Sequence, residues 1–540
     1  MELIDQHTKA IMEGCKERAR DAGLRFEDES LEYIVSNRDL LELSPKLMIP
    51  TLYDYWVHDV EVLKEKGRYE LYPSNPFETV INTRPAISYY NDNNPDWLNV
   101  MIFYHVLGHI DFFQNNLFFR HTWDYDLTGQ ALADKRLIEK LRSEHGRWVD
   151  YVIEFARAID NVVGYHRELS RQFRPESARH SARLDYYFDV FLQRTKKVRT
   201  TDYLAEIERY NRCVKENGEM GEQAFFGDVA KTYPEFESVY QKSLKEKGGR
   251  PTDLMQFLID HSKFLDRDEN KWMLSILQIV RSTSLYFQPQ IRSKIMNEGW
   301  SSYWHEKLFM QDERIRGHEV DFARVNASVT SLPRVGLNPY ALGMRLFDDI
   351  EQMADRGRYS WDFQKLRDSE QRKHFERRDV SGRDFIFRVR ENFCDFTFIN
   401  TFVDQDFVDR HRLFVTEKVL DQARMVWQYK VKSRRVEDYR QMLFASLYHP
   451  PKIEIDLGQS TEGSLYLVHV FEGKPLLQDY IPNTMLGIEF LWGAPVQLET
   501  IEPATTTAPS TERGEPKQES LAWRRVLYTM DNRELTRQVL

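Results

Sequence analysis

The sequence predicts a mainly α, multi-helical body over residues 1–415, followed by a small α/β domain over residues 416–501. Two observations lead to this fold class. Apolar residues recur every three to four positions through most of the first 415 residues, as on the buried face of a helix. After residue 416 the spacing changes to the strict alternation of a half-buried strand, which is clearest in the run KIEIDL.

The N-terminal third of the chain is expected to be largely helical. Residues 1–70 carry apolar side chains at helical spacing. Four prolines within residues 71–97 prevent a long helix there, and residues 79–83 are expected to be extended. An Asn-Pro pair then starts a helix over residues 95–113, and further long helices are expected over residues 131–195.

The middle of the chain alternates between polar segments and strong helical patterns. Residues 196–252 are charged and are expected to form loops and helical excursions. A helix over residues 254–281 is expected to be interrupted by Gln-Pro-Gln at 288–290, before another helix over residues 294–308. Asn338 followed by proline predicts a helix cap and a first-turn proline.

The C-terminal pattern predicts the order β-α-β-β-α-β, which is the ferredoxin-like arrangement. The expected strands and helices are, in order, 426–432, 436–448, 452–457, 465–471, 476–491 and 496–500. Residues 502–540 are expected to be a flexible tail, because residues 502–518 are rich in Thr, Pro, Ser and Glu. A short docking helix is expected near the end of that tail, within residues 521–540.

Composition excludes several functional classes. The net charge of −10 over 540 residues argues against a general nucleic-acid binder. The longest apolar run, residues 98–107, is too short to span a bilayer, and the N-terminus lacks an apolar signal core. The three cysteines are scattered without pairing or thiolate–zinc spacing. We therefore expect a cytoplasmic protein with no membrane span and no nucleic-acid partner.

Two segments far apart in the sequence carry candidate metal ligands. In YHVLGHIDFFQNN, His105 and His109 are four residues apart, so a helix places both on one face. In KIMNEGWSSYWHEKL, the helical period places Glu298 and His305 on one face as well. Two histidines from one helix and a glutamate from another are a common zinc ligand set. We expect one zinc-like ion at His105, His109 and Glu298, with His305 as fourth ligand or proton donor.

Four stretches together resemble the SpoVR (stage V sporulation protein R) family. They are HVLGHIDFFQNN, LYFQPQIRSKIMNEGWSSYWH, LNPYALG and, near the C-terminus, LWGAPVQLE. The resemblance covers roughly residues 10–500. In the family, acidic residues usually precede the YF-x-PQ motif, whereas Ser282 and Thr283 stand there in this chain.

The resemblance implies a cellular role more directly than it implies a reaction. The family is linked by name to spore cortex formation and is widespread in bacteria that do not sporulate. Its genes often lie beside those of a PrkA-like serine kinase and a von Willebrand factor A domain protein. This implies a role in sporulation or stationary-phase stress, with those two proteins as partners.

A second, local resemblance concerns chemistry. NEGWSSY is similar to the third-ligand helix of gluzincin metallopeptidases, whose glutamate binds zinc beside two histidines of an HExxH helix. This implies a zinc-dependent hydrolase that acts on amide bonds of peptide or cell-wall material. Position 106 holds valine, where those enzymes have the glutamate that serves as general base. His305 and Glu306 are the nearest substitutes, and we consider both as candidate catalytic residues.

Each candidate also has a structural interpretation. The histidine pair can be core residues bonded to backbone or carboxylates, Glu298 can pair with Arg292 or Lys294, and His305 can pack between tryptophans. Four polar residues after the histidine helix could orient the imidazoles or serve in turns and caps: Asp111, Asn115, Asn116 and Arg120. Two functions stay open, a zinc-dependent hydrolase and a non-catalytic partner in a kinase-linked stress complex.

Overall fold

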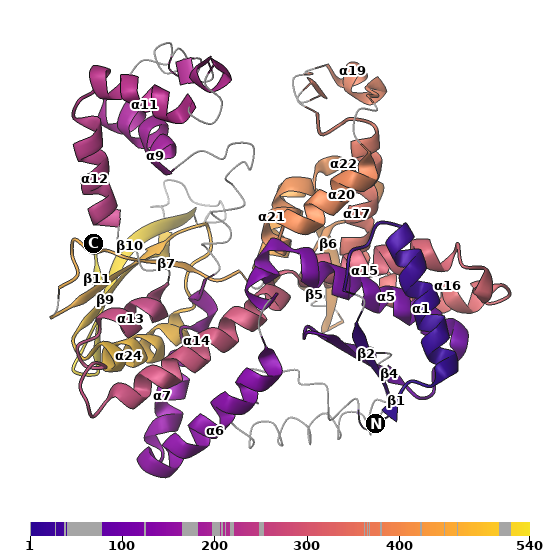
Figure 1. The fold of residues 1–540 in the computed structure, drawn as a ribbon, viewed down its shortest axis with the longest axis horizontal. Helices are drawn as coiled ribbons and strands as arrows, with labels where there is room; N and C mark the ends of the chain where they lie inside the picture. Colours follow the sequence, from indigo (N-terminus) through magenta and orange to yellow (C-terminus); the bar gives the residue numbers. More distant parts are fainter. Residues whose placement is uncertain are drawn as a thin grey trace. The chain divides into compact units, whose positions relative to one another are not determined.

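The chain forms two compact units, one made of residues 1–168 with 253–540 and the other of residues 169–252. Figure 1 shows the elements of this computed structural model in sequence colours. The boundary predicted near residue 416 does not coincide with this division. The structure describes residues 2–27, 29–36, 39, 78–123, 126–164, 182–196, 206, 209–210, 212–216, 221–247, 253–360, 362–363, 366, 368–377, 381–421, 424–447, 449–461, 463–506 and 520–540.

The larger unit begins with a helix and a four-stranded sheet of order β1-β2-β4-β3. The elements are α1 (Gln6–Asp21), β1 (Glu2–Leu3), β2 (Ser30–Val35), β3 (Glu78–Ile81) and β4 (Ala86–Asn91). Strand β3 agrees with the extended segment that the prolines predicted. Strand β2 corrects the prediction of a helix there. The apolar residues of β2 fit a helical face locally, but the segment pairs in parallel with β4, a contact that local spacing does not reveal.

A layer of long helices forms the centre of the larger unit, and several of them were predicted closely. They are α5 (Asp96–Asn115), α14 (Lys271–Arg292), α15 (Lys294–Phe309), α16 (Glu319–Thr330) and α17 (Pro339–Asp355). Helix α5 carries apolar residues on all sides and is buried from Leu98 to Phe113, as expected for a helix surrounded by protein. Asn338 caps α17 as predicted, its side chain accepting a hydrogen bond from the Ala341 N–H.

Three glycines let α5, α15 and α17 approach closely. A Cβ at Gly108 of α5 would lie 2.7 Å from the Ser301 Cα of α15. A Cβ at Gly299 would lie 2.4 Å from the Gly343 Cα of α17, and one at Gly343 would meet the backbone of α15 in turn. Ordinary carbon–carbon contacts are about 3.5–4.0 Å, so any larger residue would force these helices apart. The glycines therefore fix the depth at which α15 lies between its neighbours.

The start of α15 is held by a residue from a distant helix. The Asp395 carboxylate accepts hydrogen bonds from the Ile295 and Met296 N–H groups, both at 2.9 Å. These two groups lack partners within the helix because they lie in its first turn. Asp395 belongs to a group of helices after α17, namely α19 (Ser369–His374), α20 (Gly382–Asn392), α21 (Asp395–Phe402) and α22 (Gln405–Arg410).

Helix α14 corrects the break predicted at residues 288–290. The helix continues through Pro289 and ends at Arg292. The Ser293 hydroxyl then donates to the Pro289 carbonyl at 2.6 Å. A proline removes one helical hydrogen bond, but the surrounding side chains are buried, so tertiary packing outweighs the local penalty.

The C-terminal α/β part confirms the predicted order of elements but not the ferredoxin-like sheet. The elements are β5 (Val415–Asp421), β6 (Val426–Ser433), α23 (Val436–Ser446), β7 (Lys452–Ile455), β8 (Leu465–Val470), α24 (Ile481–Trp492), β9 (Val496–Thr506), β10 (Ser520–Asp531) and β11 (Glu534–Val539). The first predicted strand, β6, pairs with β5 in a separate hairpin. The remaining strands form a five-stranded sheet of order β11-β10-β9-β8-β7.

The tail also differs from the sequence prediction. A short helix was expected within residues 521–540, but β10 and β11 form an antiparallel hairpin there. Val526, Tyr528 and Met530 are buried, and they alternate along β10 with the less buried Leu527 and Thr529. This period-two alternation places them in the core of the sheet. The linker predicted over residues 502–518 begins as part of β9, and residues 507–518 lie outside the described residues.

Two large apolar cores stabilise the described part of the larger unit. The first surrounds α5, α15 and α17. The second joins the C-terminal sheet and α24 to four helices: α6 (Leu127–His145), α7 (Trp148–Arg157), α13 (Leu254–His261) and α14. The C-terminal sheet therefore shares its core with earlier parts of the chain.

The smaller unit is built around aromatic side chains. Its described elements are α9 (Ala182–Asp185), the π-helix η3 (Tyr186–Thr195), α11 (Gly221–Thr232) and α12 (Phe236–Lys247). Four of these aromatic side chains are buried: Tyr187, Phe191, Phe225 and Phe236. Tyr187 contacts Phe225 and Phe236 edge to face, and Phe191 contacts Phe236 in the same way. Across the described residues of both units, no helix is both long enough and apolar enough to cross a membrane.

Candidate metal centre

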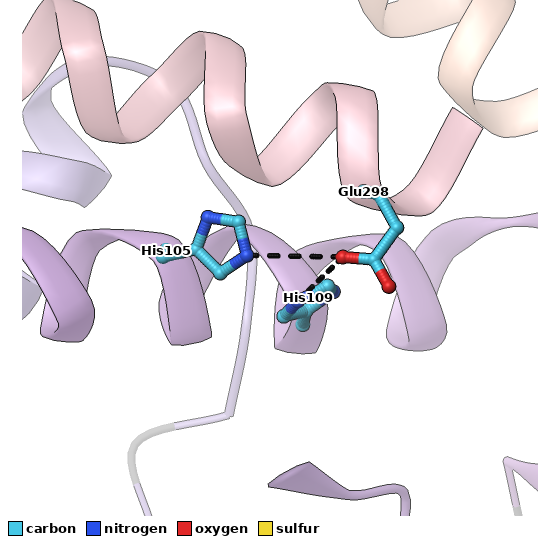
Figure 2. A group of neighbouring side chains, drawn as sticks. All are labelled: His105, His109 and Glu298. Carbon is cyan, nitrogen blue, oxygen red and sulfur yellow. Dashed lines mark ion pairs between the residues drawn. The ribbon is translucent and has the colours of Figure 1, made fainter. Parts of the chain in front are cut away.

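The three candidate ligands predicted from the sequence lie together in the structure. His105 and His109 project from successive turns of α5, and Glu298 projects toward them from α15 (Figure 2). The Glu298 Oε2 atom lies 3.9 Å from the His105 Nε2 and 3.6 Å from the His109 Nε2. One ligand atom from each residue falls within 4.8 Å of the others. Two helices therefore bring two imidazoles and one carboxylate to a single point.

The spacing of these atoms fits a shared ion better than direct hydrogen bonds. Separations of 3.6 and 3.9 Å are too long for hydrogen bonds between nitrogen and oxygen. Ligands about 2.0–2.2 Å from one tetrahedral zinc ion lie about 3.4 Å from each other, close to the observed distances. In addition, the buried Glu298 Oε2 accepts no hydrogen bond from the described residues. A buried carboxylate oxygen without a donor is costly, and a cation at this point would satisfy it.

The environment favours the protonation states that a metal needs. Burial lowers the pKa of His105, and it lowers the pKa of His109 to about 4. Burial alone would raise the pKa of Glu298, but the neighbouring imidazoles and the Tyr340 hydroxyl outweigh it, so that pKa lies below its usual value. At neutral pH the site therefore offers neutral imidazoles and an ionised carboxylate, which are the forms that bind metal ions.

Each imidazole is oriented by a hydrogen bond at its other nitrogen. The His109 Nδ1 lies 2.9 Å from the Asn297 Oδ1, and this carbonyl oxygen can only accept, so Nδ1 carries the proton. The His105 Nδ1 lies 2.9 Å from the Nδ1 of His305. In a neutral imidazole, a proton on Nδ1 leaves the lone pair on Nε2, the atom that faces Glu298.

The two candidate catalytic residues occupy different positions from the ligands. His305 is buried behind His105, and its Nε2 lies 2.9 Å from the Asn326 Oδ1, so both its ring nitrogens have partners. This arrangement leaves no ring nitrogen of His305 for the role of fourth ligand. Glu306 is linked to His305 only through Asn326, because its carboxylate accepts a hydrogen bond from the Asn326 amide at 2.8 Å. A catalytic role for His305 and Glu306 stays a prediction.

The polar residues after the histidines serve structural roles. The buried Asp111 carboxylate accepts hydrogen bonds from the Trp300 indole at 2.8 Å and the Arg25 backbone N–H at 2.7 Å. The Arg390 guanidinium lies 3.2 Å from the same carboxylate. Asn116 caps the turn that follows α5, its side chain accepting from the Phe118 N–H. Asp111 and Asn116 thus tie α5 to its neighbours, which agrees with the capping and packing alternative.

Several residues that complete the site were missed by sequence reasoning. Asn297 directly precedes Glu298 in the NEGW motif, so the motif itself could have marked Asn297 as a candidate site residue. Tyr340 lies in the LNPYALG stretch and stacks on the His105 ring with centroids 6.0 Å apart. Asn326 and Asp395 lie in segments with no motif. Only the fold brings these last two residues to α15.

Comparison with known proteins supports the resemblance seen in the sequence. The family model described as "SpoVR like protein" matches residues 3–449, which include all three candidate ligands. The protein named "Uncharacterized protein YcgB" from Escherichia coli (strain K12) is 23% identical over 496 residues, covering 86% of each chain. No solved structure gives a significant match. Because the family model covers most of its length, this chain belongs to the SpoVR family.

Proposed function

We propose that this chain is a metal-dependent hydrolase whose metal ion is held by His105, His109 and Glu298. Zinc is the first candidate for this ion. The observation that carries the proposal is the convergence of two imidazole Nε2 atoms on a buried carboxylate oxygen that lacks a hydrogen-bond donor. Neutral imidazoles with one carboxylate suit zinc or iron better than magnesium. When bound, such an ion supplies Lewis-acid chemistry, because it polarises a carbonyl oxygen for attack.

The chain's own residues would share the remaining tasks. The amide-bond substrate, in peptide or cell-wall material, is inferred from the resemblance to gluzincin peptidases. Tyr340 is partly exposed, and its hydroxyl contributes to lowering the pKa of Glu298. In the proposed reaction this hydroxyl would exchange its hydrogen bond to Glu298 for one to a substrate carbonyl oxygen beside the ligands. The general base would come from outside position 106, since Val106 is fully buried and apolar.

The hydrolase proposal is tested with zinc-loaded protein and mixtures of peptides and cell-wall muropeptides. Mass spectrometry should detect new amine and carboxyl ends with the wild type and none with Glu298→Gln. Glu313→Gln is the matched control, because the Glu313 side chain is 74% exposed and lies outside the site. Tyr340→Phe should retain zinc and lose most of the activity. Zinc-loaded wild type that cleaves none of these substrates would contradict the proposed reaction.

The second candidate function is that of a non-catalytic partner in a stress or sporulation complex in the cytoplasm. Val106 favours it, because the base of the peptidases is absent from its usual position. The partners implied by the family are a PrkA-like serine kinase and a von Willebrand factor A domain protein. Co-expression followed by purification of this chain should then recover both proteins. If neither protein co-purifies, and the activity of the serine kinase is the same with and without this chain, this alternative is rejected.

A further inference from the structure

A line of hydrogen bonds leads away from the candidate ligand His105 through the protein interior. The His105 Nδ1 lies 2.9 Å from the Nδ1 of His305, and the His305 Nε2 lies 2.9 Å from the Asn326 Oδ1. The Asn326 Nδ2 donates to the Glu306 Oε2 at 2.8 Å. His105 and His305 are 5% and 1% exposed, so water cannot replace their partners freely. We call these four residues the relay.

The direction of every hydrogen bond in the relay follows from Glu306, the residue at the end of the relay farthest from His105. The Glu306 carboxylate can only accept, so it holds the amide nitrogen of Asn326 toward itself and the amide oxygen toward His305. That oxygen also only accepts, which places a proton on the His305 Nε2. A second proton on His305 would create a buried imidazolium with no carboxylate among these hydrogen-bond partners, an unfavourable state. The His305 Nδ1 is therefore the acceptor, and the His105 Nδ1 is the donor.

We propose that Asn326 and Glu306 are positioning residues that hold His105 in the tautomer with its proton on Nδ1. In that tautomer the lone pair is on Nε2, which faces Glu298. The inference deepens the proposed metal site, because it explains how one of its ligands is kept ready to bind. Asn297 performs the same task for His109 in a single step. The tautomer of His109 is thus fixed by one hydrogen bond, and that of His105 by a chain of three hydrogen bonds.

The outer end of the relay can be altered without disturbing the core. Glu306 is only partly buried, and together with Asn326 it lines a cavity of about 660 Å³ between α15, α16 and α17. Thr330 lies one turn after Asn326 on α16, and its hydroxyl donates to the Asn326 backbone carbonyl rather than to the relay. Thr330→Val therefore changes a buried side chain of the same helix while leaving the hydrogen-bonding groups of the relay in place.

The test combines a tautomer measurement with zinc affinity. Full-length protein labelled with ¹⁵N-histidine, free of metal, is studied by long-range ¹H–¹⁵N NMR, and His105 is assigned by comparison with His105→Gln. The wild type and Thr330→Val should show His105 protonated on Nδ1. Asn326→Leu and Glu306→Leu should show a mixture of tautomers. Zinc affinity, measured by chelator competition, should fall about 10–100-fold in these two variants.

A rescue variant separates positioning from simple support of the fold. Asn326→Gln keeps an amide oxygen that can accept from the His305 Nε2, so the tautomer and most of the zinc affinity should return relative to Asn326→Leu. Protonation of His105 on Nε2 in the wild type, or the same tautomer and affinity in Glu306→Leu as in Thr330→Val, would overturn the relay. A wild type that binds no zinc but shows the expected tautomer refutes the proposed metal function and supports the relay.

Discussion

Replacing Gly108 by alanine should disturb both folding and the metal site. The added Cβ would lie 2.7 Å from the Ser301 Cα, about 0.8–1.3 Å short of an ordinary carbon–carbon contact. Helices α5 and α15 would have to separate by a similar amount, and overpacking of this kind typically costs about 1–3 kcal/mol. Alanine also favours a helix by about 1 kcal/mol relative to glycine, so the net loss of stability should be up to about 2 kcal/mol.

The same displacement should weaken metal binding. Glu298 lies one turn before Ser301 on α15, so a shift of that helix moves the carboxylate away from both imidazoles. Such sites must be held to within about 0.5 Å, and a shift near 1 Å exceeds that limit. Urea unfolding followed by circular dichroism measures the stability, and chelator competition measures the zinc affinity. Gly227→Ala, in an exposed part of α11 with no atom within 4 Å of its Cβ, should instead be stabilising. Unchanged stability and affinity in Gly108→Ala would refute this reasoning.

Three further predictions concern the rest of the molecule. Burial raises the pKa of Asp395 to about 7, so its stabilising effect is full at low pH and is lost as the pH rises through 7. The stability of the wild type relative to Asp395→Asn should therefore decrease between pH 5 and 7 by up to about 1.4 kcal/mol per pH unit, and a constant difference in urea unfolding would contradict this. Ending the chain after residue 506 removes β10 with its buried Val526 and Met530, so soluble yield and melting temperature should fall, whereas ending it after residue 533 removes only the exposed β11 and should change little. A fragment of residues 1–415 loses the sheet that shares a core with α7 and α14, so we expect it to aggregate, and a monodisperse fragment with native helicity would contradict that.

The parts of the fold that the sequence predicted well are those set by local periodicity. Helices α5 and α15 lie within two residues of their predicted bounds, because their apolar pattern and flanking signals are local. Strand β2 was taken for a helix, because its pairing with β4 joins segments more than 50 residues apart. Strand β10 was assigned to a flexible tail, because it follows a run rich in Thr, Pro, Ser and Glu. Packing likewise overrode the helix break expected at Pro289.

The candidate site divides in the same way. His105, His109 and Glu298 were found because a helical spacing of four and a family-like motif are visible in the sequence. Asn326 could not be found, because it reaches His305 only through the packing of α16 on α15. The candidate ligands could thus be predicted, whereas the residues that orient them required the structure.

The most direct test of the account is the metal content of the purified protein. Elemental analysis after zinc reconstitution should give about one ion per chain for the wild type and for His374→Ala, whose side chain is exposed. His109→Ala and Glu298→Gln should contain much less. Zinc at 100 times its dissociation constant should also stabilise the wild type by about 2.7 kcal/mol, and both variants should lose this shift. A wild type that holds no metal after reconstitution, with a melting temperature insensitive to chelator and to zinc, would contradict the central claim.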